Sequence, residues 1–139
     1  MFKETVLSKL WLFDKGLTFV ETTGGWGSNV YSNGSVDIGN TLGVYSSTNN
    51  GTYQGTLVSL AKIDITNYSK LKAVCSEIGS LGAIGIYSAR NVNSCVKYKG
   101  YEAGVTELDL SDYNGEYYIG LYAIGTVGWT RISQFWLEP

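Results

Sequence analysis

The chain has 139 residues, including 18 Gly, 11 Tyr, 4 Trp and a single Pro, and only 16% of its residues are charged. This is the length of one domain, and turn-forming glycines together with strand-favouring aromatics predict a single β-rich domain over residues 1–139. The net charge of −2 and the scattered Lys and Arg argue against a nucleic-acid surface, and the absence of an apolar run of ~20 residues argues against membrane insertion.

Two further features concern where the protein is made. The N-terminus has no basic segment followed by a long apolar core, so we expect synthesis in a host cytoplasm without a secretion signal. Cys75 and Cys95 lie in separate predicted strands. Because cysteines are too sparse for a disulfide-stapled secreted domain, two reduced thiols are favoured over a disulfide.

The elements predicted along the chain are almost all short strands separated by turn residues. Residues 1–12 form a first strand or an N-terminal arm, with an amphipathic turn of helix as the alternative. Glycines at 24, 25 and 27 let the backbone bend around the ring of Trp26. The polar tract 46–51 is typical of an exposed hairpin loop. Strands are predicted at residues 17–20, 36–38, 42–45, 57–65, 71–78, 83–89, 94–99, 105–110, 117–124 and 129–137.

Two of these strands end in the same way. Residues 63–68 (IDITNY) and 108–113 (LDLSDY) each place one acid between two aliphatic side chains and continue into a turn that ends on a Tyr. We interpret Asp64 and Asp109 as acceptors for turn N–H groups, and the two tyrosines as plugs that fold back. A chain that makes this corner twice, without sustained helical periodicity, predicts an all-β, two-sheet antiparallel β-sandwich with jelly-roll topology.

Catalysis is not expected. The chain has no His, which excludes the commonest general base and the His-dependent triads and metal sites. Two acid pairs remain, Asp64 with Asp109 and Glu102 with Glu107. The first pair is better explained by the turns, and the second flanks a hairpin in solvent. We therefore predict no enzyme activity.

Several motifs together carry a resemblance to a known class of domain. They are WLFDKG at 11–16, TGGW at 23–26, ITNYSKL at 65–71, LDLS at 108–111, YYIG at 117–120 and RISQFWLE at 131–138. This order resembles the jelly-roll domains, similar to carbohydrate-binding modules, of tail and structural proteins in phages and prophages of Gram-positive bacteria. The resemblance implies a virion protein that recognises bacterial surface carbohydrate.

The resemblance carries three more expectations. The alternative function is a virion structural or decoration protein whose aromatic surface mediates oligomer assembly, with residues 1–12 swapped onto a neighbour. A homo-oligomer, most naturally a trimer, is expected in either case. No cofactor is predicted. A structural Ca²⁺ on Glu21 and Glu138 would require the first and last strands to be neighbours, and the chain has no dense acidic loop.

Sugar sites pair an exposed Trp or Tyr ring with side chains that form directional hydrogen bonds. Trp11 and Trp136, flanked by aliphatics, are expected in the core instead. For Trp26, a ring tucked under the sheet and a ring presented to ligand stay open as alternatives. The predicted ligand-binding residues are Trp26, Tyr31, Tyr45, Asn50, Tyr53, Tyr87, Arg90, Trp129 and Arg131, with no catalytic or metal-binding residue among them.

Overall fold

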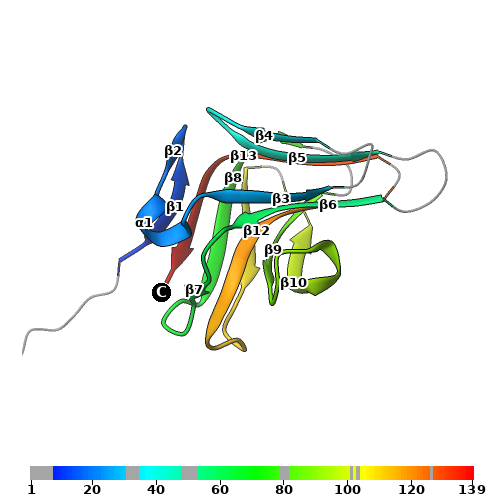
Figure 1. The fold of residues 1–139 in the computed structure, drawn as a ribbon. Helices are drawn as coiled ribbons and strands as arrows, with labels where there is room; N and C mark the ends of the chain where they lie inside the picture. The colour runs from blue at the N-terminus through cyan, green and yellow to red at the C-terminus, as the bar shows by residue number, and fades with distance from the viewer. Residues whose placement is uncertain are drawn as a thin grey trace, which may run out of the picture.

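Two antiparallel sheets packed face to face form a β-sandwich (Figure 1). The structure is a computed structural model and describes residues 8–30, 35–47, 53–78, 82–100, 102, 104–125 and 127–139. The predicted all-β, two-sheet sandwich is confirmed, while its jelly-roll topology stays a prediction. Neither of the short helical segments within these ranges is long and apolar enough to cross a membrane.

The first sheet is organised around the last strand of the chain. The N-terminal half of this strand pairs with β5, and its C-terminal half pairs with β1 on the same side. The opposite side of the strand pairs with β8 along most of its length. The strands of this sheet are β11 (Val105–Asp109), β8 (Lys70–Ile78), β13 (Val127–Glu138), β1 (Leu10–Asp14), β2 (Leu17–Thr18), β5 (Leu42–Ser47) and β4 (Ser35–Ile38).

The second sheet packs face to face with the first and is centred on β12 (Figure 1). Its strands are β10 (Cys95–Gly100), β9 (Gly82–Tyr87), β12 (Glu116–Gly125), β6 (Tyr53–Ser59), β3 (Trp26–Val30) and the short β7 (Ile63–Asp64). One helical turn, α1 (Val20–Thr23), precedes β3, and a 3-10 turn, η1 (Val92–Ser94), follows β9.

The core lies between the sheets and follows from the alternation of strand residues. In β12, Ile119 and Leu121 point inward and are fully buried. In β13, Ile132 and Phe135 do the same from the other sheet, three residues apart because the register shifts between Ile132 and Gln134. Removing such side chains from water is the main stabilising contribution in a sandwich of this size.

A second apolar cluster covers the outer face of the second sheet. Val92 from η1 packs there with Val58, Ala83, Tyr87 and Tyr122. Because the segment around η1 covers this face, every residue of β9 is buried, on both faces of the strand.

Three predicted elements differ from the structure. The strand expected at 17–20 stops at Thr18, because the chain closes one helical turn that ends at Gly24 with a φ of 71°. The strand expected at 57–65 is broken into β6 and β7 by a bend, where the Ser59 hydroxyl donates to the Ala61 carbonyl at 2.8 Å. β5 and β6, on either side of the tract 46–51 that was expected to be a hairpin loop, belong to different sheets and do not pair, and residues 48–52 lie outside the described ranges.

The two predicted corners hold each other in place. The N–H of Ile65, in the first corner, donates to the carbonyl of Gly115 at 2.9 Å, just beyond the second corner. The N–H of Leu110, in the second corner, donates to the carbonyl of Ser69 at 2.7 Å, just beyond the first. Tyr68 and Tyr113 both pack against the core, which confirms their predicted role as plugs.

Candidate functional site

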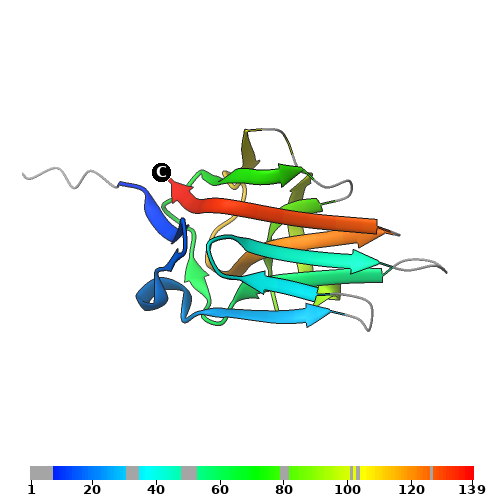
Figure 2. The same cartoon turned by 90° about the horizontal axis from the view of Figure 1, so that it is seen from above.

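A pocket of about 210 Å³ opens on the outer face of the first sheet. It lies over β4, β5 and β13, which run side by side in the view from above (Figure 2). Among the residues that line it are Ser35, Asp37, Gly43, Tyr45, Thr130 and Arg131.

The strand register creates the polar part of this pocket. Asp37 on β4 and Arg131 on β13 both lie opposite Gly43 of the central strand β5. Paired residues of neighbouring strands share a face, so the carboxylate and the guanidinium meet above the glycine. Their closest atoms, Arg131 Nε and Asp37 Oδ2, are 3.8 Å apart, and both side chains are partly exposed.

Asp37 has a second partner that fixes its carboxylate. The hydroxyl of Thr41, in the turn between β4 and β5, donates to Asp37 Oδ2 at 3.1 Å. One oxygen therefore faces both a hydroxyl donor and a cation, and the carboxylate is oriented before any ligand arrives.

Gly43 is the floor of the pocket. A Cβ at this position would lie 3.4 Å from Arg131 Nε and 3.5 Å from the Cβ of Asp37, which is ordinary van der Waals contact. The glycine thus leaves room for a Cβ beside two charged side chains, and a larger side chain would extend into the pocket.

Tyr45 supplies the aromatic wall. It lies two residues after Gly43 on β5, hence on the same face, and it is half-buried. In the register it lies opposite Ser35 on β4 and Trp129 on β13. The structure therefore brings together two of the predicted site residues, Tyr45 and Arg131, and places the backbone of Trp129 beside them.

Sequence reasoning missed Asp37 and Gly43. Only the strand pairing shows that Asp37 lies across from Arg131, since nothing in the local sequence fixes which strands become neighbours. Gly43 did carry a signal, because an isolated glycine inside a strand pattern often marks a place where another group approaches closely.

The prediction that Tyr87 contacts ligand is wrong. Tyr87 is fully buried in the cluster under η1, and its hydroxyl donates to the carbonyl of Leu121 at 3.1 Å. This burial raises the pKa of the Tyr87 phenol well above its ordinary value. Because this apolar strand is covered on both faces, the ring of Tyr87 has no exposed face on which a ligand could stack.

Trp26 and Arg90 lie apart from the pocket. The Trp26 indole N–H donates to Thr18 Oγ1 at 3.0 Å and its ring stacks on Phe135 at 6.2 Å, which supports the tucked alternative. Arg90 is exposed, and its guanidinium carbon lies 5.9 Å from the ring of Tyr118, on the second sheet.

The remaining predicted positions are not tested. Tyr31 and Asn50 lie outside the described residues. Tyr53 and Trp129 belong to β6 and β13, but their side chains lie outside the described part of the chain.

Trp11 and Trp136 form an aromatic pair on the outer face of the first sheet, at the far end from the pocket. They lie opposite each other in the register with ring centroids 5.2 Å apart. The Lys9 ammonium lies 4.9 Å from the centre of the Trp136 ring. Trp136 is only 6% exposed, as predicted, whereas Trp11 is only half-buried, and neither belongs to the core cluster between the sheets.

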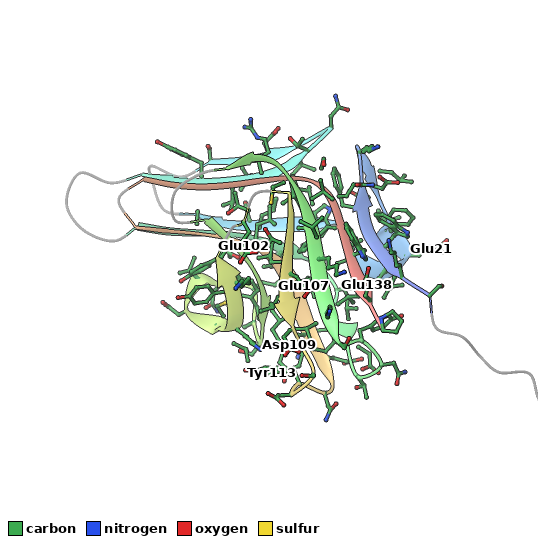
Figure 3. All side chains as sticks on the ribbon, turned by 180° about the vertical axis from the view of Figure 1, so that it is seen from behind. Glu21, Glu102, Glu107, Asp109, Tyr113 and Glu138 are labelled. Atoms are coloured by element: carbon green, nitrogen blue, oxygen red, sulfur yellow. The ribbon has the colours of Figure 1, made fainter. Side chains whose placement is uncertain are left out.

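The carboxylate of Glu138 has two partners within the protein itself. It accepts a hydrogen bond from the Trp136 indole at 3.0 Å and pairs with Lys72 at 2.8 Å. The hydrogen bond from Lys72 lowers the pKa of Glu138. Figure 3 shows Glu138 on β13 and Glu21 near α1, and no group of three or more metal-ligating side chains was found in the described ranges.

The other acids considered for chemistry have structural partners. Glu102 pairs with Lys99 at 3.3 Å, and Glu107 lies 3.3 Å from each of Lys70 and Lys72 (Figure 3). Both glutamates are exposed, as predicted.

Both cysteines are free thiols, as predicted. Cys75 Sγ lies 3.3 Å from the hydroxyl of Thr106. Cys95 is largely enclosed next to Tyr87, and burial raises the pKa of its thiol to about 11. Such a thiol is mostly protonated at neutral pH and is therefore a poor nucleophile.

In comparisons with known proteins, the chain matches no family model, no curated protein and no solved structure.

Proposed function

We propose that this chain is a non-catalytic binding domain of a phage-type tail or virion protein, and that the pocket over β4, β5 and β13 binds bacterial surface carbohydrate. The observation that carries the proposal is that Asp37, Tyr45 and Arg131 lie in one pocket over three paired strands. Sites built on strands hold their side chains more firmly than sites on loops.

The side chains of the pocket suit a sugar ring. The face of a pyranose carries C–H groups that can pack on an aromatic ring such as Tyr45, while its hydroxyls can donate to a carboxylate and accept from a guanidinium. The volume of about 210 Å³ is below the ~300–1,000 Å³ of pockets for drug-sized ligands, which suits one sugar ring.

The virion context of this proposal comes from the resemblance to phage jelly-roll domains. A site that holds one sugar ring binds weakly, and tail proteins present several copies of a domain to one surface. Linking several weak sites in this way raises the overall avidity by roughly 10²–10⁴-fold when the geometry lets them engage together. A trimer would meet this requirement.

The test is binding of the labelled native protein to an array of bacterial surface glycans, alongside four variants. Arg131→Ala and Tyr45→Ala remove the polar and aromatic parts of the pocket. Gly43→Val fills it without removing any polar group. Arg90→Ala is the matched control, because it makes the same change at an exposed arginine between β9 and η1, near Tyr118 of the other sheet.

We expect the native protein to bind glycans selectively, with an affinity that falls at least tenfold in Arg131→Ala, Tyr45→Ala and Gly43→Val and is unchanged in Arg90→Ala. Far-UV circular dichroism will show that all four variants are folded. Binding that survives Gly43→Val and Arg131→Ala would exclude this pocket. No glycan binding by the folded native protein would overturn the proposal.

One observation favours the alternative role in virion assembly. Apolar side chains are exposed along one end of the first sheet, on β2, α1 and β4: Leu17 is 58% exposed, Val20 is 60% exposed and Ile38 is 52% exposed. If these side chains join subunits, Ile38→Lys will reduce the molar mass measured by light scattering while glycan binding per chain is retained.

A further inference from the structure

We infer that the pocket takes an uncharged sugar through two neighbouring hydroxyl groups, and that Asp37 makes it reject the corresponding uronic acid. This inference rests on the proposed function and adds the chemical class of the ligand. The inference depends on one observation: the cation of the pocket, Arg131, already faces the carboxylate of Asp37, which accepts a hydrogen bond from Thr41.

The two charged side chains of the pocket balance each other. Asp37 and Arg131 are the charged side chains among the residues that line it, so the pocket has one positive and one negative group and no net charge. An anionic sugar gains little long-range attraction from such a pair, since each charge cancels the field of the other.

Two neighbouring groups hold the carboxylate of Asp37 in position. The Thr41 hydroxyl donates to Asp37 Oδ2, and the Arg131 guanidinium faces the same oxygen. A carboxylate on the ligand would have to compete with Asp37 for the guanidinium and would lie near a like charge, which is unfavourable.

The hydroxyl groups of a sugar can bind both charged side chains of the pocket at once. Each sugar hydroxyl can donate one hydrogen bond and accept others. Two hydroxyls on adjacent ring carbons can therefore serve the pair together, one donating to the carboxylate of Asp37 and the other accepting from the guanidinium of Arg131. Bonds of this kind to charged groups are about twice as strong as those between neutral groups.

Gly43 lies beneath the two charged side chains, and a Cβ there would already contact both. A sugar edge bearing two hydroxyls would lie over the pair, in the pocket that a larger side chain at position 43 would fill. Gly43 is therefore a residue that determines specificity, because a larger side chain there competes with the ligand.

The experiment uses matched pairs of methyl glycosides that differ only at C6: glucoside and glucuronide, galactoside and galacturonide, mannoside and mannuronide. Each is titrated by NMR into the native protein, into Asp37→Asn and into Asp112→Asn. The amide of Asn keeps an oxygen that can accept from Thr41 but loses the charge. Asp112→Asn makes the same charge change at an exposed position in the second corner, away from the pocket.

We expect at least one neutral glycoside to bind the native protein more tightly than its uronate, by up to about fivefold, which is the effect of one like charge at about 4 Å in water before any compensation by Arg131. Asp37→Asn will remove this preference by improving uronate binding, and Asp112→Asn will leave it unchanged. Retention of the preference in Asp37→Asn would overturn the assignment to Asp37.

The outcomes separate the inference from the proposed function. If the native protein binds uronates as tightly as neutral glycosides, or binds array glycans but none of the six glycosides, the inference is wrong and the proposed function stands. If the folded native protein binds neither the glycosides nor any array glycan, both are wrong.

Discussion

Asp64 and Asp109 make the same hydrogen bond in two matching corners of the sandwich. Oδ1 of Asp64 accepts from the backbone N–H of Thr66 at 3.0 Å, and Oδ1 of Asp109 accepts from that of Ser111 at 2.9 Å. Hydrogen bonds from Thr66, first from its side chain and then from its backbone, lower the pKa of Asp64, and those from the backbone and side chain of Ser111 lower the pKa of Asp109. Both corners close with a Tyr N–H donating to the carbonyl three residues earlier, at Ile65 and Leu110.

The first prediction separates the hydrogen bond of Asp109 from its charge. Asp109→Ala removes the acceptor for the Ser111 N–H, so we expect a lower melting temperature at pH 7. Asp109→Asn keeps an acceptor oxygen, so its melting temperature should lie between those of the native protein and Asp109→Ala. Thermal denaturation followed by circular dichroism measures this order. Equal melting temperatures for the Ala variant and the native protein would show that the corner does not need the side chain.

The second prediction concerns acid. Because the folded-state pKa values of Asp64, Asp109, Glu107 and Glu138 lie below the ordinary 3.8 and 4.5, these carboxylates stabilise the fold fully above the ordinary values. That stability is lost as the pH falls through the lowered values. We therefore expect the free energy of unfolding to decrease below about pH 4.

A double variant tests the source of this acid sensitivity. Asp64→Asn/Asp109→Asn should lose less stability between pH 5 and pH 3, measured by urea denaturation at each pH, than the native protein loses. An identical pH profile for both proteins would assign the acid sensitivity to other carboxylates.

The third prediction compares two strand glycines. A Cβ on Gly120 would collide with the backbone of β6, including the carbonyl oxygen of Leu57, and would lie 2.6 Å from the Cα of Val58. Backbone atoms of a central strand cannot move aside cheaply, so Gly120→Ala should destabilise the protein by about 1–3 kcal/mol or more.

Gly43→Ala is the control, since its Cβ would make only ordinary contacts. Its free energy of unfolding should lie within about 1 kcal/mol of the native value in urea denaturation. Similar losses for both variants would contradict the close approach of β6 and β12 at Gly120.

The fourth prediction uses the buried tyrosine. Tyr87→Phe removes the hydroxyl that donates to the Leu121 carbonyl, and that carbonyl also accepts from the Thr56 hydroxyl at 2.7 Å. The carbonyl thus keeps a partner, and we expect a loss of about 0.5–1.5 kcal/mol, with glycan binding unchanged. A change in glycan binding by the folded variant would restore Tyr87 as a ligand residue.

The fifth prediction concerns thiol reactivity. Because the pKa of Cys95 is raised to about 11, the Cys75→Ser protein should react slowly with a disulfide reagent at pH 8, and faster as the pH rises towards 11. The measurement is the rate of thiolate release at several pH values, with the urea-unfolded protein as the reference. Native and unfolded protein reacting at the same rate at pH 8 would contradict the burial of Cys95.

The sandwich and its corners were predictable because they depend on local patterns. Alternating strands separated by turn residues indicated the fold class, and an acid followed by a turn indicated the roles of Asp64 and Asp109. The break between β6 and β7 was not predictable, because residues 57–65 are apolar enough for a continuous strand and only the Ser59 turn interrupts them.

The pocket was predictable only in part. Tyr45 and Arg131 are residue types that suit a sugar site, so the sequence alone indicates them. That Asp37 lies beside them depends on which strands pair. Tyr87 was assigned wrongly because its ring was considered apart from its strand: residues 82–87 (GAIGIY) are all apolar or glycine, which is typical of a strand buried on both faces, and the segment around η1 covers the outer one.

The most direct test of the central claim is a ¹⁵N NMR titration of the native protein with the glycan that binds best on the array. The account predicts chemical-shift changes centred on the amides of Asp37, Gly43, Tyr45 and Arg131, and their loss in Gly43→Val. Changes centred on Arg90 and Tyr118 of the second sheet, with those of β4, β5 and β13 unmoved, would contradict it.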